Sequence, residues 1–245
     1  MTTLQVTEIM RRLEQGMTRP FLVRAEDDVL YVAKGRETTQ RGLIAEWICA
    51  HLAQQLGLPI PAFTLLQVPP ELVSALGQEV AALGHGAVFG SAQQSGVQEF
   101  AVTQLKRVDI QQRRMLLAFD WWVENADRSL SAHGGNPNLL WDAAQSQLLV
   151  IDHNLAFDAE FDEASFFETH VFRQEADTVF DDLVCRAETS ERLDAALSCF
   201  DAAVQAIPPE WLWLDGEART LPVQVDFDVL KRRLSLRARL ERGFQ

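Results

Sequence analysis

The sequence has few lysines, few cysteines and no long apolar run, and each shortage excludes a class of protein. Only three lysines accompany nineteen arginines, and the formal net charge is −13. Binding to a nucleic acid requires a basic surface, so this charge argues against a nucleic-acid partner. It also argues against an anionic membrane surface, and no apolar run reaches membrane-spanning length. We therefore expect neither a nucleic acid nor a membrane as a partner.

The cysteines and histidines are also too sparse for a metal centre built from them. Cys49, Cys185 and Cys199 are isolated from one another, without the spacing of a metal site. An odd number of isolated cysteines, with no signal peptide, is typical of a reducing compartment, so we expect a cytoplasmic protein. The five histidines are scattered along the chain, which argues against a histidine metal cage.

The sequence contains enough apolar residues for a full hydrophobic core, since 47% of its 245 residues are hydrophobic. The pattern up to Lys106 is rich in strands with one main helix, and the remainder is mostly helical. We therefore predict an α+β chain of two lobes, residues 1–106 and residues 107–245. A site at the junction of the lobes is the natural expectation.

The spacing of apolar residues predicts individual elements along the chain. These are a helical or strand–helix segment over 4–14, a hairpin of 21–25 and 29–34, a helix over 41–56, strands over 63–68, 87–91 and 100–105, and a helix over 110–124.

Lys34 and Glu46 are the first candidates for a functional site. Lys34 ends the apolar strand, and Glu46 lies inside the helix 41–56 between apolar neighbours. A buried ammonium or carboxylate is costly without a partner of opposite charge. One hypothesis is that Lys34 contacts nucleotide phosphates and Glu46 holds it in place. The alternative is an exposed lysine whose stem packs along the strand end.

Further along, an acid, two amides and a second acid follow one another between apolar runs. Asp127 lies in a polar loop after the helix 110–124, Asn136 and Asn138 precede an apolar strand, and Asp152 ends the next one. An aspartate can orient a substrate hydroxyl, and amide and carboxylate oxygens are suitable ligands for magnesium. The alternative for Asp127 and both asparagines is a set of ordinary turn residues.

A tight turn near the amino terminus is a weaker candidate. Gly16, Thr18 and Arg19 belong to a turn whose backbone amides could cover a phosphate. A single glycine is also typical of an ordinary turn.

Together these segments resemble the HipA-like kinase family, specifically its short stand-alone kinase domains within the protein-kinase and phosphatidylinositol-kinase-like superfamily. The matching segments are residues 16–23, 31–34, 45–48, 56–61, 125–128, 136–141 and 151–153. The resemblance implies a two-lobed protein-kinase-like fold, with a small β-rich N-lobe and a larger helical C-lobe, that binds ATP and magnesium. It also implies a serine/threonine protein kinase with an unknown acceptor.

The resemblance assigns a role to each candidate residue. Lys34 would contact the nucleotide phosphates and pair with Glu46, and the turn of Gly16, Thr18 and Arg19 would lie over the phosphates. Asp127 would be the catalytic base. The metal ligands would be Asp152 and one of two amides, Asn136 or Asn138.

One departure from the family pattern leaves alternatives open. Residues 128–135 separate Asp127 from Asn136, whereas the family places its first metal-binding asparagine only a few residues after the base. A pseudokinase or interaction module that retains the fold without phosphoryl transfer is therefore the alternative. A kinase of small molecules is a third hypothesis, because the acceptor site has no motif of its own.

Overall fold

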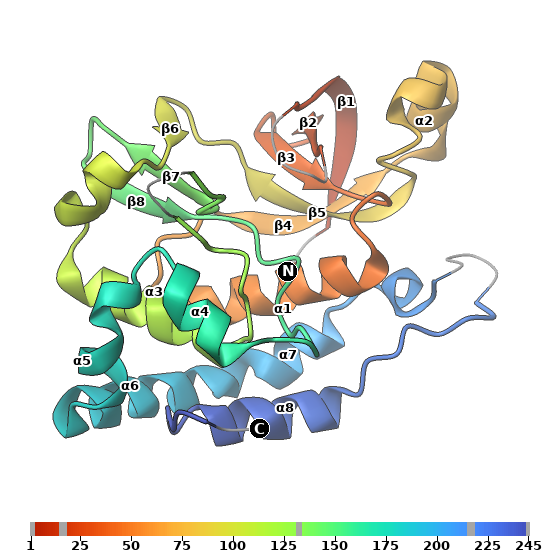
Figure 1. The fold of residues 1–245 in the computed structure, drawn as a ribbon. Coiled ribbons are helices and arrows are strands. Elements are labelled where there is room, and N and C mark those ends of the chain that lie inside the picture. Colours follow the sequence, from red (N-terminus) through yellow and green to blue (C-terminus); the bar gives the residue numbers. More distant parts are fainter. Residues whose placement is uncertain (1–2, 15–18, 131–133, 215–218, 244–245) are drawn as a thin grey trace. The chain divides into compact units, whose positions relative to one another are not determined.

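The computed structural model describes residues 3–14, 19–130, 134–214 and 219–243 (Figure 1). Its contacts divide the chain into two compact units. The first unit contains Met1–Trp47, Pro61–Ser95 and Ala206–Gln224, and the second contains Ile48–Ile60, Gly96–Gln205 and Val225–Gln245. The domain boundary at Lys106 remains a prediction.

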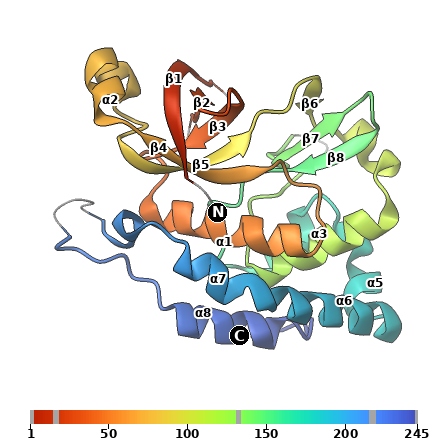
Figure 2. The ribbon, with the colours of Figure 1, turned by 180° about the vertical axis from the view of Figure 1, so that it is seen from behind.

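The first unit contains a closed five-stranded barrel, with the strand order β1-β2-β3-β5-β4 (Figures 1 and 2). The strands are β1 (Leu4–Arg12), β2 (Phe21–Ala25), β3 (Leu30–Lys34), β4 (Phe63–Val68) and β5 (Gly86–Ala92). Neighbouring strands are antiparallel except β1 and β4, whose parallel pairing closes the barrel. Closure leaves the barrel without a free edge.

Over 4–14 a helix, or a strand followed by a helix, is expected, and the strand β1 over Leu4–Arg12 shows that the helical part of this prediction is wrong. Its pairing with β2 shifts register between Val6 and Glu8 and again between Ile9 and Arg11. Each irregularity interrupts the alternation of inward and outward side chains that marks a strand. The apolar residues therefore fall at spacings that resemble a helix, although the segment is extended.

The helix α1 (Gln40–Gln55) agrees with the predicted helix and passes from the first unit into the second after Trp47. The first unit also contains α2 (Pro70–Leu76) and the 3-10 helices Gly77–Val80 and Pro209–Leu212. The last of these is tied to β5, because Oε1 of Glu210 accepts the N–H of Ala87 at 3.2 Å and Nε1 of Trp211 donates to the carbonyl of Ala87 at 2.8 Å.

The second unit contains a three-stranded antiparallel sheet of β6 (Val97–Glu99), β7 (Leu139–Asp142) and β8 (Gln147–Val150). The predicted strand over 100–105 is wrong, because Val102–Arg107 forms a 3-10 helix. Oε1 of Gln104 accepts the N–H of Ala101 at 2.6 Å and stabilises this turn.

The helices of the second unit are α3 (Ile110–Trp122), α4 (Glu163–Thr169), α5 (Ala176–Phe180), α6 (Leu183–Ala196), α7 (Phe200–Gln205) and α8 (Phe227–Arg237), with 3-10 turns at Arg173–Glu175 and Leu197–Cys199. Asp109 caps α3, since its carboxylate accepts the N–H groups of Gln111 and Gln112. Nε1 of Trp122 donates to the carbonyl of Leu234 at 2.7 Å and joins α3 to α8. None of the described helices combines the length and apolar character needed to cross a membrane.

Candidate active site

Lys34 and Glu46 form a buried ion pair in the first unit. Lys34 is the last residue of β3, and Glu46 lies on α1. Nζ of Lys34 lies 2.8 Å from Oε2 of Glu46, and the two side chains are only 9% and 5% exposed. Charges removed from water to this extent require a partner, because the loss of hydration is costly. The pair holds the Lys34 ammonium in one place at the end of a barrel strand.

The turn between β1 and β2 is described only in part. Gly16 and Thr18 lie outside the described residues. Arg19 is exposed and has a φ of 38°, and its carbonyl accepts a hydrogen bond from Nε of Arg12 at 3.2 Å. The Arg19 backbone is thereby tied to β1, and the phosphate contact of the turn remains a prediction.

Asp127 and Asn138 contact each other in the second unit. Asp127 lies in the irregular segment after α3, and Asn138 directly precedes β7. Nδ2 of Asn138 donates a hydrogen bond to Oδ2 of Asp127 at 2.8 Å. Asn138 is buried and Asp127 is half-buried. With its nitrogen engaged in this way, the Asn138 amide has Oδ1 as its acceptor atom, and such an oxygen is a suitable ligand for a hard cation.

Asn136 has different surroundings from Asn138. Its side chain is exposed, and its carbonyl accepts the N–H of Ser129 at 3.3 Å. The structure therefore places Asn138 at Asp127 and leaves Asn136 on the exposed part of the same loop.

Asp152 follows β8 at the end of a segment that lies beside Asn138. The N–H of Ile151 donates to the carbonyl of Asn138 at 3.1 Å. Asp152 is half-buried and has a φ of 62°, and Asn138 has a φ of 48°. Left-handed backbone at residues other than glycine is uncommon and persists where the surrounding contacts enforce it, often at functional sites.

Arg128 is completely buried in the second unit and joins several segments of it. Its Nε donates to Oδ2 of Asp120, on α3, at 2.7 Å. Its Nη1 lies 3.1 Å, 2.6 Å and 3.2 Å from the carbonyl oxygens of Pro137, Asn138 and Ile151. One guanidinium therefore contacts both segments that carry candidate metal ligands.

Asp120 is also bound by two other side chains. It accepts hydrogen bonds from Nδ2 of Asn125 at 2.9 Å and from Nε2 of His170 at 3.1 Å. Nδ1 of His170 accepts the N–H of Phe172 at 3.1 Å, so the proton of the neutral ring lies on Nε2.

The charge states of His170 and Asp120 have different causes, namely burial for His170 and the nearby Arg128 and His170 for Asp120. Burial lowers the pKa of His170, and this effect exceeds the opposite effect of the bond to Asp120, so the ring is neutral. Burial alone would raise the pKa of Asp120, but the Arg128 charge and the hydrogen bond from His170 lower it well below its ordinary value. Asp120 is therefore an anion that accepts three side-chain hydrogen bonds.

Known proteins resemble this chain in sequence and in fold. A family model described as HipA-like kinase matches residues 6–241, which is nearly the whole chain. The chain belongs to the HipA-like kinase family. The match confirms the resemblance carried by the sequence motifs and supports a phosphotransferase of the kinase type. A comparison of this HipA-like kinase with curated proteins gives no match.

Two solved structures of the Golgi casein kinase resemble this HipA-like kinase. The structure with Mn/ADP bound is 12% identical, with a TM-score of 0.50, and the similarity covers 98% of this chain and 74% of that one. The other is also 12% identical, with a TM-score of 0.49 and coverage of 99% and 74%. The first similarity confirms a kinase-like fold of mixed α and β content. The closed barrel is a feature that the sequence analysis did not predict.

Three residues that organise the second unit were not predicted from the sequence. Asp120, Arg128 and His170 are all buried polar residues of one network. Asp120 offered a signal, because an acidic residue within the apolar run of a helix needs a partner. Arg128 lies in the matching segment 125–128, but its polar neighbours Asp127 and Ser129 do not reveal its burial, and a lone histidine before Val171 is most often a packing residue.

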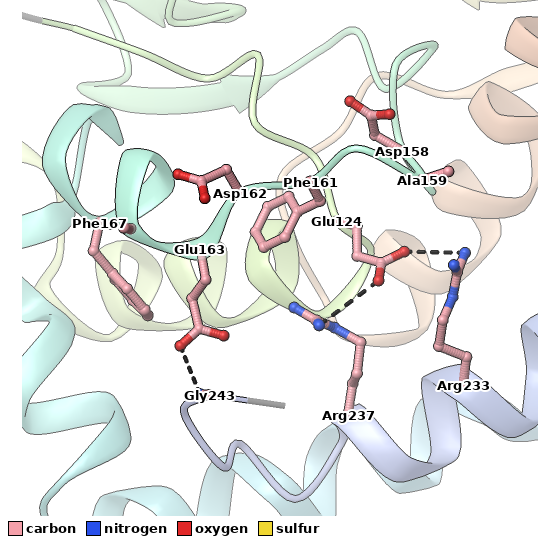
Figure 3. Close-up of a pocket in the computed structure, with 11 residues that line it drawn as sticks. Glu124, Asp158, Ala159, Phe161, Asp162, Glu163, Phe167, Arg233, Arg237 and Gly243 are labelled. Carbon is pink, nitrogen blue, oxygen red and sulfur yellow. Dashed lines mark hydrogen bonds and ion pairs between the residues drawn. The ribbon is translucent and has the colours of Figure 1, made fainter. Parts of the chain in front are cut away.

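A pocket of about 590 Å³ lies in the second unit of this HipA-like kinase (Figure 3). Glu124 pairs there with Arg233 and Arg237, at 3.0 Å and 3.6 Å. Burial raises the pKa of Glu124 although both arginines oppose the shift. Asp158 and Asp162 also line the pocket, and both are exposed.

Proposed function

We propose that this HipA-like kinase uses ATP and Mg²⁺ to phosphorylate a hydroxyl group, and that the acceptor is a serine or threonine of a protein. The observation that carries the proposal is the hydrogen bond from Nδ2 of Asn138 to Oδ2 of Asp127, at 2.8 Å. It orients a half-buried carboxylate beside a candidate metal ligand. Asp127 would then act as the base that orients the attacking hydroxyl and accepts its proton.

Asn138 and Asp152 are the proposed metal ligands. They supply an amide oxygen and a carboxylate, which are the hard oxygen ligands that Mg²⁺ prefers. The hydrogen bond between Ile151 and Asn138 supports their proximity, because it holds the two segments together. Magnesium at this position would supply positive charge to the nucleotide phosphates. The Golgi casein kinase, which is similar in fold, was solved with Mn/ADP bound.

Lys34 and Glu46 are the proposed nucleotide-binding pair. An ammonium held by a buried carboxylate is suited to contact phosphate oxygens, because the pairing fixes its position before the nucleotide binds. In this proposal Gly16, Thr18 and Arg19 lie over the phosphates.

The hydrogen bond between Asp127 and Asn138 favours an active kinase over a pseudokinase. The pseudokinase hypothesis rests on the long segment of residues 128–135, which could displace the base. The 2.8 Å distance supports a base and an amide that remain together despite that segment. A small-molecule acceptor would use the same residues, so the acceptor must be found by experiment.

The proposal is tested with Asp127→Asn, which removes the base with little change in shape. Turnover should fall by about 10²- to 10⁴-fold, because proton transfer to the base is lost. The dissociation constant for Mg·ADP should change by less than about threefold, because Asp127 faces the acceptor and not the nucleotide. ADP release, calorimetric Mg·ADP titration and mass spectrometry of protein and small-molecule acceptors measure these effects.

Asp201→Asn is the matched control, since Asp201 is an exposed aspartate paired with Lys231 in the same unit. It should leave both turnover and affinity unchanged. Equal losses of turnover and Mg·ADP affinity in Asp127→Asn would remove Asp127 from the role of base. A wild-type chain that binds Mg·ADP and phosphorylates neither protein nor small molecule would establish the pseudokinase alternative.

A further inference from the structure

We infer that Arg128 is a positioning residue that fixes the candidate base and both candidate metal ligands relative to one another. The inference rests on the proposed function, since it concerns the same site. Arg128 follows Asp127 directly in the chain and contacts the carbonyl oxygens of Asn138 and Ile151, at 2.6 Å and 3.2 Å. Ile151 in turn directly precedes Asp152. Arg128 therefore adjoins the candidate base in sequence, and its side chain contacts the two segments that carry the candidate metal ligands.

The chemistry of arginine suits this role. A guanidinium is planar, permanently charged and able to donate in several directions at once, whereas a lysine ammonium is a compact charge on a flexible stem. In Arg128 the Nε atom is directed to Asp120 and Nη1 to the carbonyl oxygens. A lysine at this position could retain the ion pair but could not reproduce both sets of contacts.

Asp120 is the anchor of Arg128. It lies on α3, a regular helix, and accepts bonds from Arg128, Asn125 and His170. Asn125 lies two residues before Asp127, so the catalytic segment is held to the same carboxylate on both sides of the base. His170 is a neutral donor whose tautomer is set by the N–H of Phe172. Asp120 is therefore bound by three side chains and is held on α3.

The same contacts explain how a long loop can follow the catalytic base without displacing it. Arg128 is the first residue of that loop, and its Nη1 contacts the carbonyl oxygen of Pro137 near the loop's other end, at 3.1 Å. The N–H of Ser129 also donates to the carbonyl of Asn136 at 3.3 Å. Hydrogen bonds thus join the two ends of the loop. Its length is then compatible with a fixed distance between Asp127 and Asn138.

The test uses a double variant, Asp120→Asn with Arg128→Met, together with the single variant Arg128→Lys. Removal of both charges together avoids an unpaired buried ion, and Asn at position 120 retains one oxygen, which can accept from Asn125 or from His170. Cooperative thermal unfolding of each variant establishes that it folds. Arg113→Met is the matched control, since it breaks a half-buried arginine–glutamate pair of the same unit, at Glu175.

Two readouts separate positioning from a merely structural role. Amide hydrogen exchange at Ile151, whose N–H bonds to Asn138, should become at least about tenfold faster in the double variant and unchanged in the control. The kcat should fall by about 10²-fold while the KM for ATP changes less than about threefold, because misplacement of the reacting groups affects the chemical step. Arg128→Lys should recover part of the loss.

Each outcome decides the inference. Faster local exchange with the selective loss of kcat supports it. A folded double variant with unchanged exchange, or with faster exchange and undiminished kcat, overturns it. If the wild-type chain binds Mg·ADP without any turnover, the proposed function fails, and the exchange measurement alone then supports or overturns the positioning of these segments by Arg128.

Discussion

At the scale of single residues, Asn136 and Asn138 have the same side chain in different surroundings. Asn138 is 8% exposed and bonds to Asp127, whereas Asn136 is exposed. A metal ligand is most effective when its partners fix its orientation before the ion binds. The Asn138 amide meets this condition because Asp127 engages its nitrogen.

Asn138→Ala should therefore weaken the response to magnesium, and Asn136→Ala should not. We expect the Mg²⁺ concentration for half-maximal Mg·ADP binding to rise by at least about tenfold in Asn138→Ala. Calorimetric titration of each variant with Mg²⁺ at a fixed ADP concentration measures the effect. The opposite ranking of the two variants would assign the metal to Asn136.

At the scale of elements, the barrel of the first unit depends on close packing between β4 and β5. Gly90 on β5 lies so close to Leu66 on β4 that an added Cβ would come 2.5 Å from Cδ1 and 2.6 Å from Cγ of Leu66. Leu66 is completely buried in the barrel core, so its side chain has no space to move into. Gly90 also pairs with Ala33, which directly precedes Lys34.

Gly90→Ala should destabilise the chain by about 1–3 kcal/mol, because the extra methyl group overpacks the core. Urea denaturation measures the change in the free energy of unfolding. Ser91→Ala, at the next position of the same strand, should stay within about 0.5 kcal/mol of the wild type. A Gly90→Ala variant as stable as the wild type would mean that the barrel core can relax around Leu66.

At the scale of the whole molecule, the proposed kinase chemistry is divided between the two units. Lys34 and Glu46 belong to the first, and Asp127, Asn138 and Asp152 belong to the second. Phosphoryl transfer requires phosphate-binding and metal-binding groups to act on one nucleotide. The proposal therefore assigns nucleotide-binding residues to each unit.

Mg·ADP should consequently slow amide exchange at β3 and in the segment around Asp152, because a bound ligand opposes local opening of the residues that contact it. Lys34→Met should weaken Mg·ADP binding by about 10- to 100-fold through loss of a charged hydrogen bond. Lys231→Met is the control, since Lys231 forms an exposed pair with Asp201. Protection confined to one of these segments would remove the other from the proposed nucleotide site.

The regular parts of the fold could be predicted from local pattern. The hairpin of β2 and β3, the helices α1 and α3, and the strand β4 agree with the expected segments, because their apolar residues follow a strand or helix period without interruption. The helical part of the prediction over 4–14 is wrong because the bulges of β1 break that period, and the predicted strand over 100–105 is wrong because Gln104 closes a turn there. The roles of the candidate site residues remain predictions.

The sequence by itself determined family membership and the ordered set of polar residues at the ends of apolar elements, because both are properties of neighbours along the chain. Only the tertiary structure decided the closure of the barrel and the choice of Asn138 as the residue beside Asp127. It also decided the convergence of carbonyl oxygens from two separate segments on Arg128. The physical reason is that these features are distances between segments far apart in sequence, and packing of the whole core sets such distances.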